Sequence, residues 1–154
     1  MTSAFVPILS ASSAPTIVNV TSGLGSFAAV HDPERIESKI TAPLCTSSKS
    51  AVTMLTMPYA KAFPEMRINA ADPGYTATDF NANSGTQTVR EGTDAIVDLA
   101  TRGGGGPTGT FIDRSGVAPS RAAVRVRRLA VIGAGAAWNR YLPRPLRDRK
   151  KVRQ

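Results

Sequence analysis

Short apolar runs alternate with helical patterns along this chain, and the alternation limits the folds that it can adopt. Residues 16–21 form a β-branched run of the kind that fills buried parallel strands. Residues 43–63 then repeat apolar side chains at every third or fourth position, which predicts a long helix. Further elements are expected at 67–71 (strand), 88–101 (helix) and 110–113 (strand). Strands that alternate with helices predict an α/β fold with a parallel sheet of about three strands and flanking helices.

Proline disturbs two of the predicted helices. Pro7 lies inside a shorter helical pattern at 2–13, and Pro58 lies inside the long pattern at 43–63. A proline within a helix removes one backbone hydrogen bond and destabilises the helix by about 3 kcal/mol. We therefore expect the long helix to kink or to end early at Pro58.

Polar motifs follow the predicted strands in a fixed order. The first strand runs into Ser22, and a loop with two glycines comes after it. Lys49 follows within the long helix, and the second strand leads into a turn that contains Pro73 and Gly74. Because the carboxyl ends of parallel strands meet at one edge of a sheet, we expect these groups to converge there.

With this order and spacing, residues 1–116 resemble the short-chain dehydrogenase/reductase family from its fifth helix to its last core strand. In that family a serine ends the fifth strand, a Tyr-x-x-x-Lys motif lies on the next helix, and a Pro-Gly loop follows the sixth strand. Ser22, Lys49 and the pair Pro73 and Gly74 match those places. The family's glycine-rich cofactor turn lies before the point where this chain begins. The resemblance therefore implies a truncated, Rossmann-like parallel sheet, the C-terminal portion only.

The resemblance also implies a role for each matching residue. Ser22 would polarise the substrate oxygen, while Lys49 would hold the nicotinamide ribose and lower the pKa of a neighbouring acid. The loop that meets the nicotinamide amide and the phosphates would contain Pro73, Gly74, Thr76 and Thr78. The implied cofactor is NAD or NADP, and the implied substrate is a small-molecule carbonyl or alcohol.

Ordinary structural roles remain open for the same side chains. Ser22 could cap the end of a strand, Lys49 could be a solvated helix lysine, and the threonines could serve turn chemistry. His31, the single histidine, is expected to be a surface residue. One histidine and one cysteine cannot build the usual metal cluster, so no metal site is predicted.

Cys45 stands where the family has its acid/base tyrosine. A thiol with a pKa of about 8.5 could in principle donate a proton, but its side chain is much shorter than a phenol. General acid catalysis contributes roughly 10²–10⁴-fold in rate, and we expect most of that factor to be lost. Cys45 is interpreted either as an inert buried thiol, which we favour, or as a reactive thiol beside Lys49.

Charge divides the chain near Gly116. Residues 1–116 carry 8 Lys/Arg and 10 Asp/Glu, whereas 117–154 carry 11 Lys/Arg and 1 Asp/Glu. We predict a partial catalytic domain over 1–116 and a basic tail over 117–154 that is disordered or partly helical.

A glycine pattern at 133–138 imitates a cofactor turn, but Trp138 occupies the position where close packing requires a small residue. Basic arms can bind nucleic acid or acidic surfaces, although specific nucleic-acid binding is not favoured here.

Two functional hypotheses follow. The first is an oxidoreductase that interconverts carbonyls and alcohols with NAD or NADP, impaired by truncation and by Cys45, and able to form a homo-oligomer through the long helix 43–63. The alternative is a non-catalytic interaction protein that uses an exposed sheet edge or the basic tail. No apolar run approaches the roughly 18 residues of a membrane span. The single cysteine fits the reducing cytoplasm, where the protein is expected.

Overall fold

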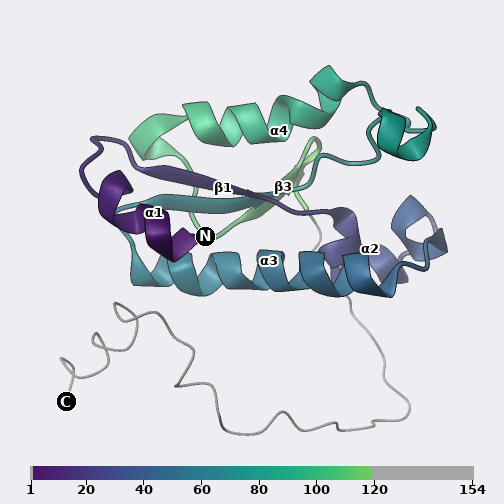
Figure 1. Cartoon of the computed structure of the whole chain (residues 1–154), viewed down its shortest axis with the longest axis horizontal. Helices are drawn as coiled ribbons and strands as arrows, with labels where there is room; N and C mark the ends of the chain where they lie inside the picture. Colours follow the sequence, from purple (N-terminus) through teal and green to yellow (C-terminus); the bar gives the residue numbers. More distant parts are fainter. Residues whose placement is uncertain (1, 119–154) are drawn as a thin grey trace, which may run out of the picture.

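The computed structural model describes residues 2–118 and contains a mixed four-stranded sheet between two layers of helices (Figure 1). The strands lie in the order β1 (Thr16–Val20), β2 (Arg67–Ala71), β3 (Phe111–Asp113) and β4 (Gly116–Val117). β1 and β3 are both parallel to β2, which lies between them. The three predicted strands and the Rossmann-like parallel arrangement are thus confirmed.

The β3–β4 pair was not predicted from the sequence. β4 runs antiparallel to β3 and has only two residues, too few to show an apolar pattern. A tight turn connects the two strands, in which the Asp113 carboxylate accepts the N–H of Ser115 at 2.8 Å. Gly116 has a φ of 118°, a conformation that other residues rarely adopt. The predicted boundary at 116 therefore falls at the start of this short strand.

Two helices cover one face of the sheet and one helix covers the other (Figure 1). α1 (Thr2–Leu9) and α3 (Pro43–Ala62) lie on one face, and α4 (Val89–Thr101) lies on the opposite face. The connections contain the short helix α2 (Phe27–His31) and the 3-10 turns η1 (Gly23–Gly25), η2 (Ile36–Lys39), η3 (Asp79–Asn81) and η4 (Gly103–Gly105). None of the helices within residues 2–118 is long and apolar enough to cross a membrane.

The long helix α3 continues past Pro58 to Ala62, close to the predicted end at 63, so of the two alternatives expected at Pro58 the early end is wrong. The residues beyond the proline are anchored by packing. Ala60 and Ala62 are buried together with Met66 and Ile68 in the core between the helices and the sheet. This burial outweighs the hydrogen bond that the proline removes.

The start of α4 follows directly from its sequence. Thr88 precedes the helix, and its hydroxyl accepts the N–H of Glu91 at 3.3 Å. The Glu91 carboxylate accepts the N–H of Thr88 in return, at 2.8 Å. This capping box satisfies backbone donors that the first helical turn would otherwise leave free.

A buried asparagine fixes the centre of the sheet. Asn69 in β2 donates to the carbonyl of Pro107 at 2.8 Å, and its side-chain oxygen accepts both the N–H and the hydroxyl of Thr110. These bonds tie β2 to the segment that leads into β3, and they satisfy a polar group that would be costly to bury alone.

Predictions about the chain beyond residue 118 lie outside the described residues. These include the state of the basic tail and the glycine pattern at 133–138. The division of the chain near residue 116 into a catalytic part and a tail therefore stays a prediction.

Candidate functional site at the carboxyl edge of the sheet

The carboxyl ends of β1, β2 and β3 meet at one edge of the sheet, toward the right in Figure 1. The N–H of Thr21 donates to the carbonyl of Ala71 at 2.8 Å, and the N–H of Asp72 donates to the carbonyl of Ile112 at 2.9 Å. Ser22 follows β1 and Pro73 follows β2 directly after these bonds. The serine and the Pro-Gly turn therefore lie at the same edge, as the sequence predicted.

Thr21 fastens this edge to helix α3. Its side chain is only 2% exposed, and its hydroxyl donates to the backbone carbonyl of Lys49 at 3.0 Å. The same hydroxyl lies 2.6 Å from the hydroxyl of Thr53, one turn further along the helix. The ammonium group of Lys49 reaches back to the carbonyl of Val20 at 3.3 Å. Lys49 is thus brought to the end of β1, at Val20, which lies two residues before Ser22 in the chain.

The turn after Ser22 packs against the backbone of α3 because residue 25 is a glycine. A Cβ at Gly25 would lie 2.7 Å from the carbonyl carbon of Lys49 and 2.8 Å from its oxygen, closer than a side chain can approach. The half-buried Ser22 caps this turn, since its hydroxyl accepts the N–H of Leu24 at 3.2 Å. The capping role considered for Ser22 is therefore present.

The Pro-Gly turn is held by its own side chains and by α4. Gly74 has a φ of 68°, which a glycine adopts without strain. The hydroxyl of Thr76 donates to the carbonyl of Pro73 at 3.0 Å. A Cβ at Gly92 in α4 would collide with that hydroxyl, so the turn lies directly on the helix.

A carboxylate is buried beneath the two turns. Asp72 is 3% exposed, and it accepts hydrogen bonds from the N–H groups of Gly74, at 2.9 Å, and Gly23. Burial raises the pKa of Asp72, and the two backbone N–H groups oppose that rise. Glu37, which pairs with Arg35 at 2.9 Å, adds a further negative charge nearby. No sequence pattern singled out Asp72 or Glu37.

No family model matches this chain. It is 31% identical over 150 residues to (+)-neomenthol dehydrogenase of Capsicum annuum, covering 76% of this chain and 48% of that protein. It is 34% identical over 123 residues to a short-chain dehydrogenase/reductase of Stachybotrys chlorohalonatus, covering 73% of this chain and 44% of that protein. The solved salutaridine reductase of Papaver somniferum matches with a TM-score of 0.56 and 26% identity, over 69% of this chain and 47% of that one.

The chain belongs to the short-chain dehydrogenase/reductase family. It spans about half the length of the curated relatives that it matches. This partial coverage agrees with the interpretation that the chain corresponds to the C-terminal portion of a family member.

Cys45, which is predicted to stand at the place of the family's tyrosine, is exposed near the start of α3. The favoured interpretation as a buried thiol is wrong, because this end of the helix projects beyond the core. Cys45 lies about one helical turn before Lys49. The histidine His31 is exposed as well, and its ring stacks on Phe27.

The backbone at Thr76 and Thr78, predicted to meet the cofactor amide, is bridged by the side chain of Asn81. The Asn81 amide donates to the carbonyl of Thr76 at 2.8 Å and accepts the N–H of Thr78 at 3.1 Å. This loop therefore presents one acceptor and one donor that suit a primary carboxamide. The contact joins residues five and three apart in a loop, and no sequence pattern indicated it.

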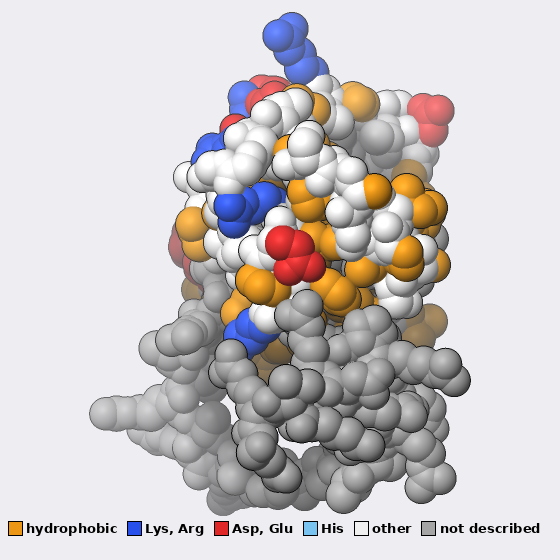
Figure 2. All heavy atoms as spheres, turned by 90° about the vertical axis from the view of Figure 1, so that its left-hand side faces the viewer, with side chains coloured by type: hydrophobic (Ala, Val, Ile, Leu, Met, Phe, Trp, Pro, Cys, Tyr) orange, Lys and Arg blue, Asp and Glu red, His pale blue; other side chains and the backbone are white. Residues whose placement is uncertain are grey.

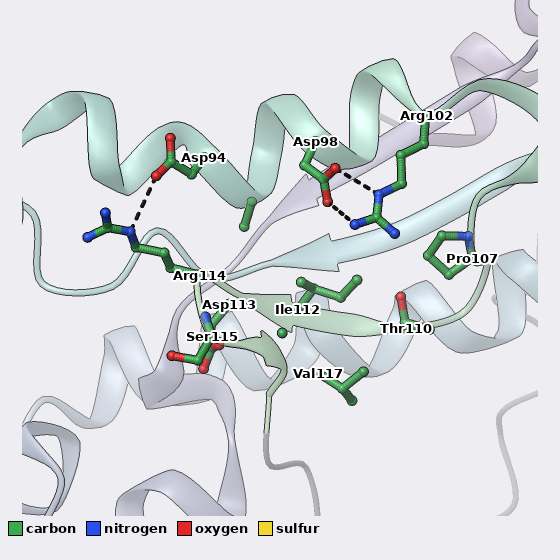
Figure 3. Close-up of a pocket in the computed structure, with 12 residues that line it drawn as sticks. Asp94, Asp98, Arg102, Pro107, Thr110, Ile112, Asp113, Arg114, Ser115 and Val117 are labelled. Carbon is green, nitrogen blue, oxygen red and sulfur yellow. Dashed lines mark hydrogen bonds and ion pairs between the residues drawn. The ribbon is translucent and has the colours of Figure 1, made fainter.

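A cavity of about 550 Å³ lies elsewhere, between α4 and the β3–β4 pair (Figure 3). Arg102 pairs with Asp98 at 2.6 Å, and Arg114 reaches Asp94 at 3.3 Å across its rim. The lining contains none of the predicted site residues. The cavity is therefore separate from the predicted site.

Proposed function

We propose that the carboxyl edge carries the substrate and nicotinamide side of an oxidoreductase that interconverts a carbonyl and an alcohol with NAD or NADP. The observation that carries the proposal is the attachment of Lys49 to the end of β1: Thr21 bonds to its carbonyl, and its ammonium group bonds to the carbonyl of Val20, at the edge where Ser22 follows β1. Family membership supports the reaction class, since the matched relatives are named as dehydrogenases and reductases. The proposed cofactor loop contains Pro73, Gly74, Thr76 and Thr78.

The residues of this edge suit a nicotinamide cofactor. The acceptor and donor at Thr76 and Thr78, now bonded to Asn81, match the carboxamide of nicotinamide. Lys49 is partly exposed and could donate to ribose hydroxyls. When bound, the cofactor supplies or accepts the hydride.

Each side chain then has a defined task. The Ser22 hydroxyl donates a hydrogen bond to the substrate oxygen and polarises the carbonyl. The ammonium group of Lys49 holds the nicotinamide ribose through a charge-assisted hydrogen bond. The thiol of Cys45 is the proton donor in this arrangement, but it is short and exposed, so we propose weak or absent turnover.

Cofactor titration tests the proposal on the 154-residue chain. We expect NADP⁺ or NAD⁺ to produce saturable NMR shifts at the amides of Thr76 and Thr78. Lys49→Ala should weaken the apparent affinity about tenfold, because a charge-assisted hydrogen bond is lost. Lys61→Ala, at an exposed position of the same helix, is the matched control and should change nothing. Absence of saturable binding by both cofactors would contradict the proposal.

A second candidate is a non-catalytic interaction protein. β1 pairs only with β2 among residues 2–118, so no described strand covers its outer edge. Large apolar side chains on α3 are also exposed, with Leu44 at 86% and Met54 at 70%, which favours a homo-oligomer through this helix.

Figure 2 shows further hydrophobic side chains on the end of the molecule that carries α1, where Phe5 and Ile8 are exposed. A concentration-independent monomer in sedimentation velocity would contradict an oligomer.

Two further proposals concern the whole chain. We place the division between a catalytic part and a basic tail near residue 116, where the charge balance changes sign. We place the protein in the cytoplasm, because its single cysteine offers no internal disulfide.

A further inference from the structure

Asp72 connects two turns that belong to different strands. One is the turn after β1, which contains Ser22 and Gly23, and the other is the Pro-Gly turn after β2. The carboxylate accepts the N–H of Gly74 at 2.9 Å and also accepts the N–H of Gly23. A single side chain thus holds the backbone on both sides of the proposed binding edge.

The space around this carboxylate is closed. A Cβ at Gly23 would lie 2.9 Å from an Asp72 oxygen and would collide with the carboxylate of Glu37. The charged groups that face Asp72 are Glu37 on η2, Asp113 at the end of β3, and Arg35, whose guanidinium pairs with Glu37. Asp72 therefore cannot turn toward solvent without releasing both glycines.

We propose that Asp72 is the positioning residue of this edge: its carboxylate sets the spacing between the Ser22 turn and the Pro-Gly turn and thereby the affinity for a nicotinamide cofactor. Asp72 lies beneath the turns and does not contact the ligand in this arrangement. The inference rests on the proposed function for its ligand, but the coupling of the two turns can be measured without any ligand.

The energetics of burial favour a role of Asp72 in positioning the two turns over a role in stabilising the fold. A buried carboxylate is unfavourable unless hydrogen bonds compensate for the lost water. Burial together with the charges of Glu37 and Asp113 raises the pKa of Asp72 in spite of the two N–H donors. The ionised group therefore opposes folding, while it offers two acceptor oxygens to two turns.

Hydrogen exchange at the amides of Gly23 and Gly74 tests the coupling on the 154-residue chain. Asp72→Asn keeps one acceptor oxygen and replaces the other by an amide donor, which cannot accept an N–H. We expect exchange of at least one of the two glycines to accelerate about tenfold. Asp32→Asn is the matched control, since Asp32 is exposed and accepts only the N–H of Glu34 within its own loop, at 3.1 Å. Unchanged exchange in Asp72→Asn would overturn the proposal.

Titration with NADP⁺ then separates the positioning role from a purely structural one. We expect about tenfold weaker binding by Asp72→Asn with no loss of melting temperature at neutral pH. Faster exchange with unaltered NADP⁺ affinity would overturn the positioning role. Faster exchange in a protein whose unmodified form binds neither NADP⁺ nor NAD⁺ would support the coupling and overturn the proposed function instead.

The unmodified chain provides a measurement that does not depend on the variant folding. As pH falls, protonation of Asp72 should shift the amide signals of Gly23 and Gly74 with one common midpoint above the usual value of 3.8. The carbon-13 signal of the Asp72 carboxyl distinguishes this event from titration of Glu37 or Asp113. Two separate midpoints, or no shift at either glycine, would overturn the proposal.

Discussion

The two faces of the sheet are joined to their helices by different kinds of polar contact. On the α3 face the contacts are hydrogen bonds that involve buried threonines: Thr21 bonds to the helix backbone at Lys49 at 3.0 Å, and Asn19 donates to Thr56 at 3.0 Å. On the α4 face the contacts are exposed ion pairs, in which Arg114 reaches Glu91 at 2.8 Å and Asp94 at 3.3 Å.

The difference has a functional meaning. Exposed ion pairs are screened by water and tolerate several geometries, whereas buried hydrogen bonds between neutral groups fix atoms in place. The residues proposed for chemistry, Ser22, Cys45 and Lys49, belong to the face with buried contacts. The α4 face contributes the loop around Thr76, which in the proposed arrangement would release Asn81 to bind the nicotinamide carboxamide.

The largest expected effect tests whether the chemistry lies on the α3 face. Cys45→Tyr places a longer side chain with a phenol one helical turn before Lys49. We expect the rate of NADPH oxidation with a reactive carbonyl to rise by about 10²-fold over the unmodified chain, because general acid catalysis is regained. Cys45→Phe, which has the size without the hydroxyl, is the control. Equal rates for the two variants would show that position 45 does not hold the acid.

A smaller effect tests the buried contacts themselves. Thr21→Val removes the hydroxyl with little change in volume and leaves the Lys49 carbonyl and the Thr53 hydroxyl without this partner. We expect the free energy of unfolding to fall by about 1–2 kcal/mol, measured by urea denaturation. Thr101→Val, which removes an exposed hydroxyl bonded to the carbonyl of Val97, should have a much smaller effect. Similar losses in the two variants would remove the contrast between the faces.

The smallest effect concerns pH and the exposed contacts. Thr88, through its N–H and hydroxyl, and Arg114 together lower the pKa of Glu91 from 4.5 to about 2. Because the pKa is lower in the folded state, this contribution is complete above pH 4.5 and is lost as the pH falls toward 2. We expect melting temperatures of Glu91→Gln to depend less on pH in this range than those of the unmodified chain. Parallel curves for the two proteins would contradict the capping role.

The contribution of Asp72 to the stability of the fold should change with pH in the opposite direction to that of Glu91. Its pKa is raised in the folded state, so its contribution to stability is complete below its usual value of 3.8 and is lost as the pH rises through the raised value. The contributions of Asp72 and Glu91 to stability therefore change in opposite directions within one acid titration.

The sequence predicted the parallel strands, the long helices and the edge where Ser22, Lys49 and the Pro-Gly turn gather. These features depend on local periodicity and on the order of motifs, which the chain displays directly. The bonds of Thr21 to Lys49 and of Asp72 to Gly23 could not be predicted, because the partners are 28 and 49 residues apart along the chain. The extent of α3 was predicted, but the early end considered at Pro58 is wrong, since the burial of the following alanines was not visible in a local pattern.

The close approach at Gly25 ties the tolerance of one position to the geometry of the whole edge. Any larger residue there would push the loop away from α3 and change the separation of the serine hydroxyl and the lysine ammonium at once. In the proposed arrangement, substitution of a residue that contacts no ligand would therefore alter the geometry of the residues that do. The close packing of this edge against α3 thus requires that residue 25 has no Cβ atom.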